Sequence, residues 1–337
     1  MMFIYFLLLI NLSLFLSLKK ISKILNIYDI PDGKLKLHGK KIPLIGGLIL
    51  ATNFFIIFVY QIFFLKDFLF LDLELVNKLE IFSILFLIYS YFLLGLYDDK
   101  FRLMPIKKIF LSIILILITI SLNKNLIVSN FSLSFYENRI FFENFSVVFT
   151  IFCILTLTNA LNFYDGINGQ SCLIFIFFFS YLLMKSNFHF FYLISIIIIL
   201  IIMLMNFKNL LFLGDSGIYL LSGILSISLI YEYNIQKSII YVDEIFFLLL
   251  LPGFDLIRLT IIRLINNKNV FLGDRNHIHH LLIKRYSLFF SNLILFSLSI
   301  FPIILFIFLK FNFYLTFSTF FVIYFSLIQF LKVNNKV

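Results

Sequence analysis

The sequence has little charge and almost no cysteine. Only 13% of its 337 residues are charged and 62% are hydrophobic, whereas about 25% of a typical soluble domain is charged. The composition therefore excludes a soluble globular protein. The two cysteines, Cys153 and Cys172, lie in or beside apolar runs and have neither disulfide nor metal-ligand spacing. We interpret both as small packing residues, which excludes a disulfide framework.

Long apolar runs fill most of the chain, and a full membrane span needs about 20 such residues. We predict an all-α fold, in which a single domain over residues 1–337 forms a polytopic membrane helix bundle with its active site at the cytoplasmic face. The first run lacks a small-residue cleavage site, so we interpret it as a retained span rather than a signal peptide. The eleven expected spans are 1–18, 44–65, 81–97, 108–122, 146–163, 171–185, 190–206, 217–232, 244–262, 288–309 and 313–331.

The net charge of +10 could suggest a nucleic-acid partner, but the positive charges are sorted between the two sides of the membrane. Of the 27 Lys and Arg residues, 20 fall in alternate connecting segments or at the adjoining span ends. The positive-inside rule places those segments in the cytoplasm. We therefore predict an amino terminus outside, a carboxyl terminus inside, no nucleic acid, and a bilayer as partner.

The remaining polar residues gather in five short stretches, each at the expected cytoplasmic end of a span. They are residues 43–47, 95–99, 159–169, 212–217 and 274–280. Gly46 and Gly47 in the first stretch would let a backbone or a ligand approach closely. Polar groups are costly in a bilayer and concentrate where they function, so we expect the five stretches to form one site between spans.

Two adjacent acids, Asp98 and Asp99, end the third span. Neighbouring carboxylates repel each other, and a hard cation such as Mg2+ or a shared catalytic proton would offset the cost. The alternative is a solvated span end that Lys100 and Arg102 neutralise.

Asn159, Asn162 and Asp165 follow at i, i+3 and i+6, near one face of a helix, and Gly166 and Gly169 suit a tight turn. No Lys or Arg lies here, so the positive-inside rule does not explain the stretch. Hydrogen bonding to a polar ligand such as a nucleoside does, and amide packing between spans is the alternative.

Asp215 stands between Gly214 and Gly217, in a turn that would let the acid reach a metal ion. Glycine–aspartate turns are also common in ordinary loops.

The last stretch holds His277, His279 and His280 beside Arg275. A structural zinc site would need four clustered ligands, so anion binding suits this group better.

Carboxylates for a metal, basic groups for phosphate and an apolar surround indicate phosphoryl transfer at a membrane surface. A transporter is the alternative from another class. It would place its acids near span centres, whereas these acids lie at span ends.

The stretches together resemble the polyprenyl-phosphate N-acetylhexosamine-1-phosphate transferases, relatives of phospho-N-acetylmuramoyl-pentapeptide transferase. The resemblance covers residues 29 to 285, in family order. It implies transfer of a sugar-1-phosphate, as GlcNAc-1-phosphate, from a UDP-N-acetylhexosamine to undecaprenyl phosphate. UMP is released, and Mg2+, or Mn2+ in its place, is required. It also implies the bacterial cytoplasmic membrane and is compatible with a homodimer.

The resemblance further implies roles for individual residues. Asp98, Asp99 and His279 would be catalytic, with Asp98 as base or nucleophile. The metal would be held by Asp99, Asn162 and Asp215. The nucleotide and diphosphate would be bound by Asn162, Asp165, Phe212, Arg275, His277, His279 and His280, and the lipid phosphate by Lys100 and Arg102.

The chain departs from the family pattern at three positions. The family usually has Asp or Asn where this chain has Arg102, Asp where it has Asn168, and Ser or Ala where it has Ile218. The Asp-Arg-x-His-Ile-His-His form of 274–280 is typical of the branch that initiates cell-envelope glycans such as O-antigen, capsule or wall polymer. We therefore prefer that branch to peptidoglycan synthesis, the alternative.

Overall fold

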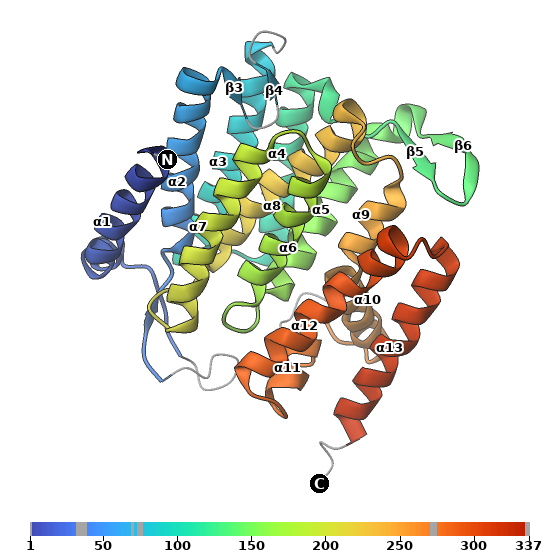
Figure 1. The fold of residues 1–337 in the computed structure, drawn as a ribbon. Helices are drawn as coiled ribbons and strands as arrows, with labels where there is room; N and C mark the ends of the chain where they lie inside the picture. The colour runs from blue at the N-terminus through green and yellow to red at the C-terminus, as the bar shows by residue number, and fades with distance from the viewer. Residues whose placement is uncertain (1, 32–38, 69–70, 73–76, 270–274, 334–337) are drawn as a thin grey trace.

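The computed structural model describes residues 2–31, 39–68, 71–72, 77–269 and 275–333 and is a bundle of α-helices (Figure 1). The helices are α1 (Met2–Leu25), α2 (Gly46–Tyr60), α3 (Lys78–Phe101), α4 (Pro105–Leu122), α5 (Ser146–Tyr164), α6 (Gln170–Lys185), α7 (His189–Phe207), α8 (Gly214–Tyr231), α9 (Val242–Leu248), α10 (Leu250–Ile265), α11 (Ile278–Ile283), α12 (Leu288–Ile303) and α13 (Phe313–Val333). Short π-helical turns, η1 (Gln61–Leu65), η4 (Glu232–Gln236) and η5 (Ile304–Phe308), extend α2, α8 and α12, and η2 (Lys124–Leu126) and η3 (Glu143–Phe145) are 3-10 turns.

The predicted polytopic helix bundle is confirmed, and each of the eleven expected spans lies on helix. The number of full-length spans differs, however. Among the described residues, nine helices are long and apolar enough to cross a membrane, and α9 with α10 makes a tenth that is bent by 68°. Pro252, near the start of α10, has no N–H to donate, so the helix cannot continue unbroken. The remaining expected span, 171–185, corresponds to α6, which has only 16 residues.

Helix α8 forms the centre of the bundle. In the most apolar 18-residue stretch of Gly214–Gln236, 89% of the residues are buried, and the helix packs against α2, α3 and α5. Its inner positions include small residues such as Ser222, Gly223 and Ser226. Small side chains let neighbouring helices approach closely in a membrane, where lipid tails provide no hydrophobic drive between helices. Asp215, in the first turn of α8, is thereby surrounded by other elements.

The all-α prediction overlooked three short antiparallel pairs, β1 (Tyr28–Asp29) with β2 (Ile42–Pro43), β3 (Asp67–Phe68) with β4 (Leu71–Asp72), and β5 (Asn130–Leu133) with β6 (Tyr136–Phe141). The β5–β6 hairpin lies at the end of the bundle opposite α11 (Figure 1). Its Phe135 ring packs against Phe313 and Tyr314 of α13, and the backbone N–H of Ser132 donates to the Tyr233 hydroxyl. These contacts join segments far apart in sequence, so local patterns did not indicate them.

Candidate functional site

Three acids and one lysine meet where α3 ends and α8 begins, and we call Asp98, Asp99, Lys108 and Asp215 the acid group. Nζ of Lys108, from the first turn of α4, donates to Oδ2 of Asp98 at 2.6 Å and also to Oδ2 of Asp215. The Lys108 side chain is only 10% exposed. One buried cation therefore lies between two carboxylates, which offsets the repulsion expected between them.

Asp99 accepts hydrogen bonds from the amino-terminal end of α8. Its Oδ1 accepts from the backbone N–H of Asp215 at 2.8 Å, and its Oδ2 accepts from that of Ser216 at 3.0 Å. The first N–H groups of a helix have no partner within the helix, and the positive end of the helix dipole favours a carboxylate there. Asp99 thus fixes the backbone that carries Asp215.

Glycines allow this close approach. Gly214 has a φ of 71°, a left-handed conformation, and a Cβ there would lie 2.7 Å from Oδ2 of Asp99. The predicted close approach of a backbone to Gly46 and Gly47 is confirmed. Their N–H groups donate to the backbone carbonyls of Phe212 and Leu213, both at 3.0 Å. Phe212 in turn donates its N–H to the Pro43 carbonyl at 2.9 Å.

The segment after α5 makes the predicted tight turn, with Gly169 at a φ of 82°. Helix α5 ends at Tyr164, however, so Asp165 is not on a continuing helix face with Asn162 as predicted. Its Oδ1 instead accepts from the Ser171 hydroxyl at 2.6 Å, while the side chain of Asn162 is half-buried. A turn of this kind releases Asp165 from the helix and leaves it exposed.

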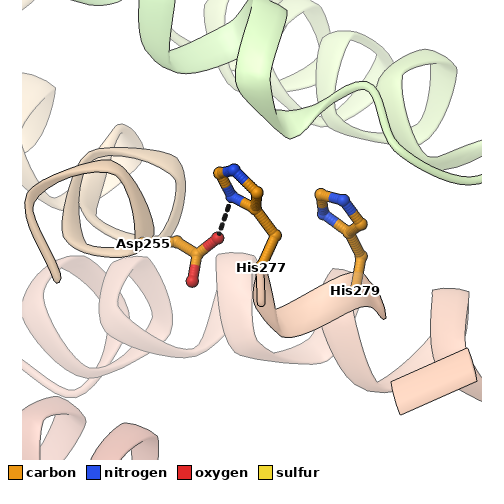
Figure 2. A group of neighbouring side chains, drawn as sticks. All are labelled: Asp255, His277 and His279. Atoms are coloured by element: carbon orange, nitrogen blue, oxygen red, sulfur yellow. Dashed lines mark hydrogen bonds and ion pairs between the residues drawn. The ribbon is translucent and has the colours of Figure 1, made fainter. Parts of the chain in front are cut away.

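A second group of polar residues lies around α10 and α11, and we call Asp255, Arg258, His277, His279 and Tyr324 the histidine group. Oδ1 of Asp255 accepts from Nη2 of Arg258 at 2.6 Å and from the Tyr324 hydroxyl at 2.9 Å. Oδ2 of Asp255 lies 2.7 Å from Nδ1 of His277 (Figure 2). A carboxylate bound to one imidazole nitrogen orients the ring and leaves Nε2 as its other functional atom.

The rings of the three histidines lie close together, and those of His277 and His279 are stacked. The His277 and His279 rings are nearly parallel, with centroids 5.2 Å apart, and the His280 ring centroid lies 4.2 Å from that of His279. His279 is fully buried, and a Cβ on Gly166 would overlap its Nε2. Burial, together with the neighbouring imidazoles, holds the pKa of His279 well below its usual range. Burial therefore favours the neutral form of His279.

The turn of residues 165–169 connects the two groups. Gly166 faces His279, and the Gly169 N–H donates to the side-chain oxygen of Asn206 at 2.5 Å. The Asn206 amide then donates to the Leu211 carbonyl at 3.2 Å, in the loop that leads to Asp215. This chain of contacts places the predicted nucleotide-binding turn between the acid group and the histidine group.

The remaining predicted site residues lie at the edges of these groups. Arg275 and His280 are half-buried, whereas Lys100 and Arg102 are exposed, and Asp274 lies outside the described residues. Helix α3 ends at Phe101, and Arg102 adopts a left-handed φ of 54° with its N–H donating to the Asp98 carbonyl at 2.8 Å. Arg102 therefore lies outside the helix that carries Asp98 and Asp99.

Two sets of residues are candidates for a metal ion. The ligand atoms of Asp255, His277 and His279 lie within 4.8 Å of one another. Both Asp255 oxygens already accept hydrogen bonds, and the Arg258 guanidinium beside them disfavours a further cation. Mg2+ prefers the carboxylate oxygens of the acid group to imidazole nitrogens, and it would take the position between Asp98 and Asp215 that the Lys108 ammonium holds here.

Sequence analysis overlooked Lys108, Asp255, Arg258 and Tyr324 as members of a site. An available signal was the pair Asp255 and Arg258, which are opposite charges at i and i+3 inside an apolar span. Intramembrane ionisable residues that face each other are functional candidates. Tyr324 had no such signal, because it lies on α13, 66 residues beyond Arg258.

Comparison with known protein families gives a match over the central part of the chain. The model of glycosyl transferase family 4 matches residues 81–232, which include α3 and α8 with all four members of the acid group. No curated protein matched the sequence. Over residues 81–232, the chain is therefore similar to glycosyl transferase family 4, the family of phospho-MurNAc-pentapeptide translocase and related polyprenyl-phosphate hexosamine-1-phosphate transferases.

Proposed function

We propose that the protein transfers N-acetylhexosamine-1-phosphate, as GlcNAc-1-phosphate, from a UDP-sugar to undecaprenyl phosphate. The observation that carries the proposal is the acid group, in which two carboxylates share one buried ammonium at the start of the central helix. Phosphoryl transfer requires mainly positioning and charge stabilisation. Fixed acids for a metal and a fixed cation for phosphate oxygens supply both.

In the proposed reaction, an oxygen of the lipid phosphate attacks the sugar-bearing phosphorus of the UDP-sugar. The new bond joins the two phosphates, the bond to the bridging oxygen breaks, and UMP leaves with that electron pair. Mg2+, held by Asp215 with Asp99 and Asn162, would neutralise the developing charge on the diphosphate. Asp98 is the candidate base or nucleophile, and its contact with Lys108 fixes the position of its carboxylate.

The donor would occupy the region between the two groups. Asn162, Asp165 and Phe212 would contact the nucleoside, whereas Arg275 and the three histidines would hold the diphosphate. His279 would be catalytic because its N–H would donate to a phosphate oxygen while the negative charge on that oxygen changes during the reaction. Neutral imidazole N–H groups and a guanidinium are donors suited to an anion in a site with little water.

The acceptor would approach from the lipid. Lys100 and Arg102 are exposed next to the acid group and would bind its phosphate. An apolar cavity of about 180 Å3 lies farther along α5, α8 and α9, lined by Phe149, Ile154, Leu157, Leu229, Val242 and Leu249 among others. An isoprenoid chain running from the acid group along α5 would reach this cavity.

A donor panel tests the function directly. Purified protein in lipid nanodiscs with undecaprenyl phosphate and Mg2+ should release UMP from UDP-GlcNAc and form a lipid-linked sugar phosphate. Omitting the lipid or adding EDTA should stop release. Exclusive use of UDP-MurNAc-pentapeptide would instead assign peptidoglycan synthesis, and no release from any UDP-sugar would contradict the proposal.

We propose that the site lies on the cytoplasmic side of the bacterial inner membrane. Orientation is testable with two single cysteines in a background lacking Cys153 and Cys172. Lys284→Cys, just after α11, should react with an impermeant maleimide only in inside-out vesicles. Glu137→Cys, on exposed β6, should react only in right-side-out vesicles. The reverse pattern would overturn the topology.

A further inference from the structure

Gln170, the first residue of α6, contacts the buried histidine of the site. Its Nε2 lies 3.3 Å from Nδ1 of His279, and the two side chains are 2% and 0% exposed. Sequence analysis gave Gln170 no role. The contact matters because neutral His279 exists in two tautomers, and its hydrogen-bond partner at one nitrogen determines which nitrogen carries the proton.

An amide nitrogen donates and does not accept. Nδ1 of His279 must therefore accept the hydrogen bond from Gln170, and the ring proton lies on Nε2. That nitrogen is buried beside Gly166 and has no hydrogen-bond partner among the described residues. A buried N–H without a partner costs free energy until an acceptor arrives, so an acceptor from outside the chain would lower that cost.

The other end of the amide faces away from the histidine. Oε1 of Gln170 is buried without a partner among the described residues, as is Oδ1 of Asn292. Both residues line a small cavity together with Tyr164 and Ser299. The cavity is lined mainly by apolar atoms but holds these two unsatisfied acceptors, to which one ordered water would donate. Such donors favour the orientation in which Oε1 points into the cavity and Nε2 points to His279.

We propose that Gln170 is a positioning residue that fixes the Nε2–H tautomer of His279, so that this N–H donates to an anionic oxygen of the donor substrate. The chemical class of the acceptor, a phosphate oxygen of a nucleotide sugar, rests on the proposed function. The tautomer itself does not, because it follows from contacts within the chain.

The tautomer is measurable without any substrate. In protein labelled with [15N]histidine and held in nanodiscs, nitrogen chemical shifts distinguish protonated from unprotonated ring nitrogens. The sequence has only five histidines, and the signals that disappear in His279→Asn identify those of His279. We expect a protonated Nε2 and an unprotonated Nδ1. A proton on Nδ1 would overturn the proposal.

Two variants test whether Gln170 is responsible. Gln170→Leu removes the donor and should give a mixture of both tautomers. Gln170→Glu offers an acceptor instead and should draw a proton to Nδ1. Retention of the Nε2–H form alone in both variants, with an unchanged thermal midpoint, would show that Gln170 does not fix it.

Kinetics link the tautomer to the substrate. For Gln170→Glu, the KM for the UDP-sugar should rise about tenfold, since one hydrogen bond to a charged group is lost, while the KM for undecaprenyl phosphate stays unchanged. An equal loss for both substrates would indicate a merely structural role. Should the wild type release no UMP from any donor, the proposed function would fail, whereas the nitrogen shifts would still decide the tautomer.

Discussion

Asp215→Asn is expected to abolish sugar-phosphate transfer while leaving the protein folded. The substitution keeps the shape of the side chain but removes the charge that pairs with Lys108, and an amide oxygen is a weaker Mg2+ ligand than a carboxylate. Loss of one preorganised electrostatic group in an active site costs about 10²–10³-fold in kcat. UMP release from purified protein at saturating lipid measures the effect.

Folding of the Asp215→Asn variant should persist, because Lys108 keeps its ion pair with Asp98, and Asp99 still accepts from the start of α8. Glu137→Gln, an exposed acid on β6, is the matched control and should retain wild-type turnover. If Asp215→Asn also retained it, the assignment of the acid group as the catalytic centre would be wrong.

Gly166→Ala is expected to lower kcat/KM by about a hundredfold or more. The added methyl group would overlap Nε2 of His279, and the buried ring has no free space into which it can retreat without moving its neighbours. A misplacement of about 1 Å at a reacting group can cost 10²-fold. The backbone of Gly166 does not require a positive φ, so the loss would come from the contact and not from backbone strain.

Gly253→Ala is the control for this substitution, because a Cβ at Gly253 meets nothing within 4 Å. Alanine there should leave turnover unchanged and should increase helix stability by about 0.5–1 kcal/mol, since glycine is a poor helix former. Equal turnover of the Gly166→Ala and Gly253→Ala variants would refute the close contact between the turn and His279. Thermal unfolding in the same detergent shows whether either variant fails to fold.

The sequence alone determined the class of fold, because about 20 consecutive apolar residues suffice to indicate a span. It also identified the five polar stretches, since charge and glycine stand out in so apolar a chain. Asp98, Asp99, Asp215 and the histidines were all found in this way. The bend between α9 and α10 was not predicted, because a span interrupted by Pro252 keeps its hydropathy while losing its straight axis.

Only the tertiary structure decided which residues act together. Lys108 was one of many basic residues at span ends until its ammonium was found between Asp98 and Asp215, which are 117 positions apart in sequence. Tyr324 of α13 and Gln170 of α6 likewise contact Asp255 and His279 across the bundle. Hydropathy depends on neighbours along the chain and is therefore readable in the sequence. Hydrogen bonds and ion pairs across the bundle depend on how helices pack, and one sequence does not encode that packing in any local pattern.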